Sequence, residues 1–161
     1  SERSAGAGAD RRGGGAGRGV PGVGWGVVNM SANELERHPI HLGLGATAQA
    51  QPVFTGDLSW YGAYEIRHAA DGAEGRLVSL HRFDAPWTMW EMHPHGAEVV
   101  LCTEGRITLQ QEHTDGRRQS VVLDPGQYAI NPPGAWHTAD GDAPACALFI
   151  TAGQGTQHRP R

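Results

Sequence analysis

The feature that most constrains the fold is a series of short β-type segments, separated by turn residues, in the second half of the chain. Segments rich in valine, isoleucine, threonine and aromatic residues are divided by Gly, Pro and Asp, and Asp115-Gly116 is typical of a tight hairpin. No segment reads as a helix long enough to connect parallel strands. The pattern predicts an all-β sandwich or barrel. The predicted strands cover residues 76–83, 87–92, 98–103, 106–113, 119–123, 127–131, 136–139 and 146–151.

One short helix is predicted before these strands. Ser31 and Glu34 form a capping-box pattern, in which the two side chains satisfy free backbone N–H groups at a helix start. We therefore expect a helix over about residues 32–38. Residues 39–56 are rich in Gly and Ala and are expected to be irregular.

The N-terminal segment has a different composition from the rest. Ten of the 24 glycines lie in residues 1–29, together with four arginines and one aromatic residue, Trp25. Such a segment buries too little to offset the entropy lost on ordering, so residues 1–29 are predicted to be a disordered tail. It is read as an extension without a role, or as an arm that contacts RNA. Residues 30–161 are then one domain, with its core at about residues 76–151.

Charge and cysteine content narrow the function classes. All 13 basic residues are arginines, which excludes lysine-based chemistry such as a Schiff base. The net charge of −4 argues against nucleic-acid binding. No apolar run approaches the roughly 18 residues that a membrane span needs. Two cysteines, Cys102 and Cys146, are too few for a disulfide scaffold and favour a reducing, cytoplasmic location with both thiols inert.

Candidate metal ligands gather in two stretches. Glu91, His93 and His95 alternate along the chain, so an extended strand would point all three to one side. Glu98 opens the next predicted strand, where a buried carboxylate needs a partner or a metal. A Pro-x-Gly turn brings His137 in from a separate strand. Imidazoles and carboxylates that converge in this way suit a divalent transition metal such as iron, manganese, zinc or nickel.

The second stretch resembles the second sequence motif of the cupin superfamily. That motif is a glycine, five residues, Pro-x-Gly, two residues and a histidine. Gly126, Pro132, Gly134 and His137 match all of these positions. The asparagine that closes the family's motif is replaced by Gly141.

The first stretch resembles the first cupin motif with one departure. The motif is His-x-His, three or four residues, a glutamate, six residues and a glycine, and its second half matches Glu98 and Gly105. One alignment makes His93 the second histidine and places Glu91 at the first, so Glu91, His93, Glu98 and His137 would be the ligands. The other takes His93 and His95 as the pair, one residue short of the usual spacing. Glu91 or His95, whichever is not a ligand, is then the candidate acid or base.

The resemblance, over about residues 76–151, implies the fold and the chemistry. It implies a double-stranded β-helix, or jelly-roll barrel, that holds one divalent transition metal ion and forms a homodimer. Proteins of this kind include dioxygenases, isomerases and lyases that act on small organic molecules. The alternative is a non-catalytic barrel that binds or senses a small ligand.

Pocket residues are the least specific part of the prediction. Aromatic and sulfur-containing side chains on the strands could line a substrate pocket or pack in the core, and a strand arginine could bind a substrate carboxylate. The candidates are Trp87, Met89, Tyr128 and Trp136 for the walls and Arg82 or Arg106 for the cation.

Overall fold

The computed structural model describes residues 31–161, and the predicted tail, residues 1–29, lies outside the described residues. Most of the described chain is antiparallel β-structure, as predicted, with one α-helix. The strands are β1 (Ile40–Gly43), β2 (Thr47–Ala50), β3 (Arg76–Phe83), β4 (Met89–Met92), β5 (Glu98–Glu112), β6 (Arg118–Leu123), β7 (Tyr128–Asn131), β8 (Trp136–Thr151) and β9 (Gln157–Pro160). The helices are α1 (Leu58–Arg67) and the 3₁₀ turns η1 (Leu44–Ala46) and η2 (Ala69–Glu74).

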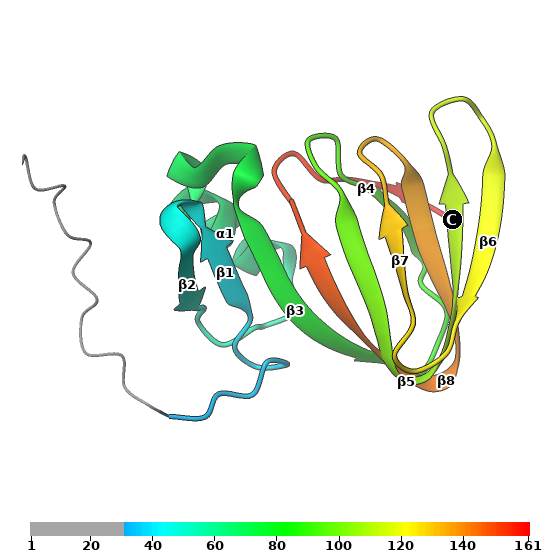
Figure 1. The fold of residues 1–161 in the computed structure, drawn as a ribbon, viewed down its shortest axis with the longest axis horizontal. Coiled ribbons are helices and arrows are strands. Elements are labelled where there is room, and N and C mark those ends of the chain that lie inside the picture. Colours follow the sequence, from blue (N-terminus) through cyan, green and yellow to red (C-terminus); the bar gives the residue numbers. More distant parts are fainter. Residues whose placement is uncertain (1–30) are drawn as a thin grey trace, which may run out of the picture. The chain divides into compact units, whose positions relative to one another are not determined.

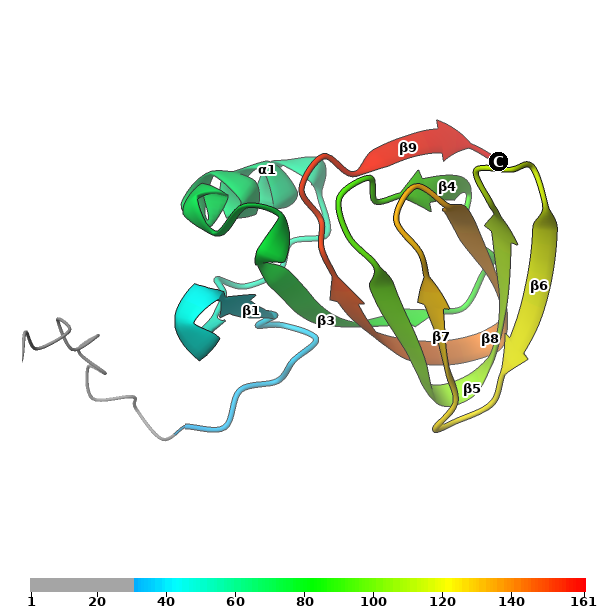
Figure 2. The ribbon, with the colours of Figure 1, turned by 45° about the horizontal axis from the view of Figure 1, so that its top comes forward.

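Two long strands, β5 and β8, organise the barrel. The first half of β5 pairs with β7 and with the last part of β8, which also pairs with β3. The second half of β5 pairs with β6 and with the first part of β8, which touches β4. Both strands therefore bend from one layer into the other, and the layers enclose the interior (Figures 1 and 2).

Gly105 lies at the bend of β5. Its φ of +72° is a left-handed conformation that glycine adopts without strain. The register between β5 and β8 shifts on both sides of Glu104, which marks a β-bulge. The sequence predicted separate strands at 98–103 and 106–113, and at 136–139 and 146–151. The structure instead joins each pair into one strand, because a bulge bends a strand without ending it.

The hydrophobic core is formed by the side chains that point inward at alternate positions along the strands. Val100, Cys102, Ile107 and Leu109 on β5 are each at most 1% exposed. They pack with β8 side chains, among them Phe149, and with Leu123 from β6. Cys102 and Cys146 are buried free thiols, as predicted. Burial of each large aliphatic side chain contributes about 1.5–3 kcal/mol, so this cluster holds the two layers together.

The predicted helix at residues 32–38 is wrong. Only one turn forms there, closed by the N–H of His38 donating to the carbonyl of Glu34. Pro39 disfavours a helical conformation at His38, and a single turn does not repay the cost of helix nucleation. The α-helix lies later, in α1, where the Asp57 carboxylate accepts from the N–H of Trp60 and caps the first turn.

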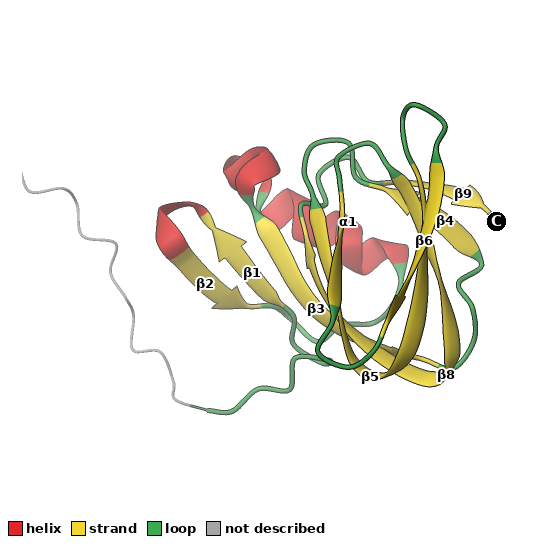
Figure 3. Ribbon diagram, turned by 45° about the vertical axis from the view of Figure 1, so that its right-hand side comes forward, coloured by secondary structure: helices red, strands yellow, loops and turns green. Residues whose placement is uncertain are grey.

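Helix α1 packs against the start of β3. Trp60 and Tyr64, one turn apart, are buried with Leu77 in a second apolar cluster. Figure 3 shows the helix beside the sheet that contains β3. A capping aspartate followed by aromatic residues at i and i+4 is a helix signal in the sequence that the prediction overlooked. The prediction that residues 39–56 are irregular is also wrong, because β1 and β2 pair as an antiparallel hairpin there.

Candidate metal centre

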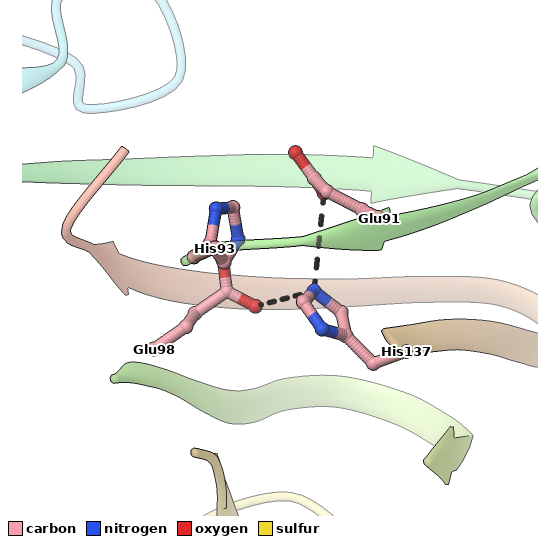
Figure 4. A group of neighbouring side chains, drawn as sticks. All are labelled: Glu91, His93, Glu98 and His137. Carbon is pink, nitrogen blue, oxygen red and sulfur yellow. Dashed lines mark hydrogen bonds and ion pairs between the residues drawn. The ribbon is translucent and has the colours of Figure 1, made fainter. Parts of the chain in front are cut away.

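Four ligand-type side chains meet inside the barrel. Glu91 lies on β4, His93 just after it, Glu98 at the start of β5 and His137 near the start of β8. One nitrogen or oxygen atom from each lies within 4.8 Å of the others, and Figure 4 shows the four side chains facing one another. His93, Glu98 and His137 are each at most 3% exposed. We call these four residues the central cluster.

Glu98 is the middle of this cluster. Its Oε2 lies 3.0 Å from Nε2 of His93, and its Oε1 lies 3.2 Å from Nε2 of His137. Asn131 donates to Oε1 at 3.0 Å and Thr151 donates to Oε2 at 2.7 Å. These two donors fix the orientation of the carboxylate, as outer partners of metal ligands commonly do.

The two imidazoles present the same nitrogen to the centre. Nδ1 of His93 is 2.7 Å from the Thr156 hydroxyl, and Nδ1 of His137 is 3.3 Å from the carbonyl of Ala135. Nε2 of each ring is thereby directed inward. Although Nε2 of His137 is close to Glu98, it is buried without a hydrogen bond of acceptable geometry. An unsatisfied buried nitrogen beside two carboxylates fits a divalent cation, and the nitrogen and oxygen donors suit a first-row transition metal.

The electrostatics of the cluster also favour a cation. Burial acts to raise the pKa of Glu98, but the nearby His137 and the hydrogen-bonded His93 outweigh it and hold that pKa below its ordinary value. Burial acts to lower the pKa of His137, but Glu98 and Glu91 raise it above its ordinary value. Positive charge is thus stabilised between the carboxylates, where protons and a metal ion would compete.

Glu91 joins the cluster to the last strand. Its Oε2 is 4.0 Å from Nε2 of His137, and its Oε1 is 3.4 Å from Nε2 of His158 on β9. The hydrogen bond that His158 donates to the Glu91 carboxylate raises the pKa of His158. Sequence reasoning assigned His158 no role. Only the pairing of β9 with β4 brings it to the site, so no local signal could have found it.

His95 lies apart from the cluster. It is exposed to solvent, and its ring is next to Gly155 in the turn before β9. Of the two readings of the first motif, the structure therefore brings together the ligand atoms of the one that uses Glu91 and His93.

A cavity of about 830 Å³ opens beside Glu91, His93 and Glu98. Trp87, Met89 and Arg82 contribute to its lining, and Arg82 also pairs with Glu104 at 2.6 Å. The other pocket candidates do not line it. Tyr128 is 63% exposed on β7, Arg106 pairs with Asp124 at 2.8 Å, and Trp136 stacks under the guanidinium of Arg159.

A second group, formed by His41, His68 and Asp71, also has ligand atoms within 4.8 Å of one another. Both ring nitrogens of His41 are already engaged, by Tyr64 at 2.7 Å and by Asp71 at 2.6 Å. The rings of His41 and His68 are stacked 3.6 Å apart and nearly parallel, so one ion could not lie in both ring planes. We read this group as a hydrogen-bonded tie between β1, α1 and η2.

Comparisons with known proteins found similarity in structure only. No protein-family model matches the chain, and no curated protein sequence matches it. The hydroquinone 1,2-dioxygenase of Sphingomonas sp. TTNP3 is 21% identical over 47% of this chain and 59% of its own, with a TM-score of 0.42. A cupin superfamily protein from Desulfitobacterium hafniense DCB-2 is 21% identical over 47% of this chain and 65% of its own, with a TM-score of 0.40. An oxalate oxidase is 18% identical over 51% of this chain and 43% of its own, with a TM-score of 0.40.

These matches are partial, and the chain spans less than two thirds of the length of each of those three proteins. Within the described residues, no helix is long and apolar enough to cross a membrane. The fold assignment rests on the antiparallel strand order, on the bends of β5 and β8, and on the meeting of both motifs in one cluster. With these features, strands β3 to β8 form an all-β barrel, as the resemblance to the cupin motifs predicted.

Proposed function

We propose that the chain binds one divalent transition metal ion through Glu91, His93, Glu98 and His137, and is a metal-dependent enzyme for a small organic molecule. The observation that carries this proposal is Nε2 of His137, which is buried, unsatisfied and directed at two carboxylates. The reaction class is that of a dioxygenase, an isomerase or a lyase. Iron, manganese, zinc or nickel each suit the donors.

The four residues of the central cluster differ in burial, and so in their proposed roles. The rigid part of the site consists of His93, Glu98 and His137. Each of these side chains is buried and has a hydrogen-bonding partner outside the central cluster. Glu91 lies at the cavity wall and contacts His158, whose side chain is 42% exposed. This pair offers a route for a proton between solvent and the cavity, so Glu91 acts as fourth ligand or as acid and base. A bound metal would polarise a substrate oxygen or activate O₂.

Elemental mass spectrometry of the purified full chain tests the metal. We expect about one transition metal ion per chain. His93→Ala and His137→Ala should each lose at least roughly nine tenths of it while the circular dichroism spectrum stays that of the parent. His113→Ala, at the end of β5 away from the cavity, is the matched control. Unchanged metal content in both site variants would contradict the proposal.

A second copy of the chain is the proposed macromolecular partner. The outer face of the sheet made by β3, β8, β5 and β7 is apolar, and Ile130 on it is 52% exposed. In Figure 1 no described helix or strand lies in front of these strands. Patches of this kind mark interaction surfaces, and a two-fold dimer uses the same patch on both subunits. Residues paired across the four strands form two apolar rows on this face. One row is Val78, Ile150, Val99 and Ile130, and the other is Leu80, Leu148, Leu101 and Tyr128.

Sedimentation of the full chain tests the dimer. We expect a mass near twice 17.1 kDa for the parent chain. Ile130→Asp should shift the mass to that of a monomer, because a charge would be buried at the interface. Ser120→Asp, on the exposed strand β6, is the control. A parent chain that sediments as a monomer would overturn the dimer and leave the metal site unaffected.

We also propose a cytoplasmic location, on the chemistry of the cysteines. Cys102 and Cys146 are both free and buried, which suits a reducing compartment. Titration of the denatured, unreduced protein should find two thiols per chain.

A further inference from the structure

The cavity beside the central cluster has an aromatic wall. Six ring-bearing side chains line it, and each ring is within 6.2 Å of the next, centroid to centroid. These ring contacts start at helix α1 and pass through the segment before it to β3. They continue to β8 and to the loop before β4, and they end at β3 again. The six side chains, in order, are Tyr61, Phe54, His81, Phe149, Trp87 and Phe83.

Two polar side chains interrupt this wall without partners. Ser79 and His81 are two residues apart on β3, so they share its inner face and both line the cavity. Among residues 31–161, neither the Ser79 hydroxyl nor a ring nitrogen of His81 has a hydrogen-bond partner, and none of these atoms is fully buried. Burial lowers the pKa of His81, which favours the uncharged form of its imidazole. Because both groups line the cavity, they are available to hydrogen-bond a molecule bound there.

The register places these groups at increasing distance from the metal ligands. Leu77 on β3 pairs with Thr151, which donates to Glu98. Ser79 and His81 follow at two-residue steps of about 6.6 Å along the strand. Ser79 and His81 therefore lie at successive steps along the inner face of β3, and the ring of His81 stands between those of Phe54 and Phe149.

We propose that the cavity binds a planar aromatic molecule that has an oxygen donor at the central cluster and a second polar substituent hydrogen-bonded by Ser79 and His81. This inference rests on the proposed metal site for the first end of the molecule. Flat rings stack on the wall with offset or edge contacts, which a saturated ring cannot reproduce. The pair on β3 selects the length of the molecule and its far substituent.

Three probes separate the parts of this inference. They are 4-hydroxybenzyl alcohol, 4-methylphenol, which lacks the far hydroxyl, and 4-(hydroxymethyl)cyclohexanol, which lacks the aromatic ring. Binding to the metal-loaded full chain is measured by calorimetry without oxygen. We expect 4-hydroxybenzyl alcohol to bind roughly tenfold more tightly than 4-methylphenol, as one hydrogen bond implies, and the saturated probe to bind most weakly.

Variants then test the two β3 side chains. Ser79→Ala should weaken binding of 4-hydroxybenzyl alcohol by about three- to tenfold and leave 4-methylphenol within about twofold. His81→Ala also removes a ring of the wall, so it should weaken both probes, and 4-hydroxybenzyl alcohol more than 4-methylphenol. His81→Asn keeps a donor and an acceptor and should recover part of the loss. His113→Ala is the matched histidine control. Ser79→Ala removes a single oxygen atom, so it keeps the test valid if a His81 variant fails to fold.

The outcomes distinguish this inference from the metal site. Equal binding of the aromatic and saturated probes, no binding of any probe, or Ser79 and His81 variants that bind like the parent would overturn it. Metal content measured on the same samples reports on the central cluster alone, and it should not change in the β3 variants. A parent chain without metal would contradict the proposed function instead.

Discussion

Glu91 lies directly opposite His137 in the register of β4 and β8, and Nε2 of His137 is 4.0 Å from a carboxylate oxygen of Glu91. Side chains opposite each other on antiparallel strands project to the same face, so the register itself delivers Glu91 to the cluster. On its other side Glu91 pairs with His158 of β9. Glu91, which one of the two alignments places at the first histidine of the cupin motif, thus lies between two imidazoles.

We predict that Glu91→Ala lowers metal affinity by tenfold or more, because it removes a carboxylate beside the ion and leaves His137 with one acidic neighbour. His95→Ala should change metal affinity by less than about twofold, since His95 is exposed and outside the cluster. Competition with a chelator of known affinity measures both. The reverse order of effects would favour the reading of the motif that uses His95 as a ligand.

The hydrogen bonds of His41, which connect β1 with α1 and η2, should be important for stability. His41 is 1% exposed and bridges Asp71 and Tyr64. His41→Ala leaves a carboxylate and a phenol without their partner, and we expect it to lower the free energy of unfolding by about 3 kcal/mol. Urea denaturation measures this. His95→Ala, an exposed histidine, should stay within about 0.5 kcal/mol of the parent, and an equal effect of the two variants would contradict the role of His41.

Gly105 should tolerate no side chain at the bend of β5. A Cβ there would overlap the carbonyl of Pro144 and come within 3.0 Å of Cα of Ala145. Gly116 has a similar positive φ, but a Cβ there would meet no atom within 4 Å. Gly105→Ala should therefore cost at least about 2 kcal/mol more than Gly116→Ala, which carries the backbone cost of about 1 kcal/mol alone. Similar unfolding free energies for the two variants would show that the bend is not tightly packed.

Alkaline pH should unfold the protein through two tyrosines. Burial raises the pKa of Tyr61 and of Tyr64 to about 12, from an ordinary value of 10.0. In this pH range the folded state keeps protons that the unfolded state has released, so stability is present below pH 10 and falls as the pH rises from 10 to 12. Tyr64→Phe should make this fall shallower. Tyrosinate absorbance and unfolding free energy, followed together, measure it; a tyrosinate signal complete by pH 10.5 would contradict the prediction.

Local patterns predicted much of the strand content and the main ligand candidates. The segments at 76–83, 119–123 and 127–131 match β3, β6 and β7 to within one residue, because alternation and turn residues act over a few positions. The predicted helix at residues 32–38 does not form, because a capping box favours the start of a helix but does not set its length. Pro39 ends the turn before a second turn can form.

The sequence by itself determined which side chains could ligate a metal, because His93, Glu98 and the Pro-x-Gly turn before His137 are spaced by short, local rules. Only the tertiary structure chose Glu91 over His95 as their neighbour, brought His158 to the cluster, and assembled six rings from separate elements into one wall. The physical reason is that these contacts depend on how far β5 and β8 bend and on the register between strands distant in sequence. Neither property is encoded within any single segment.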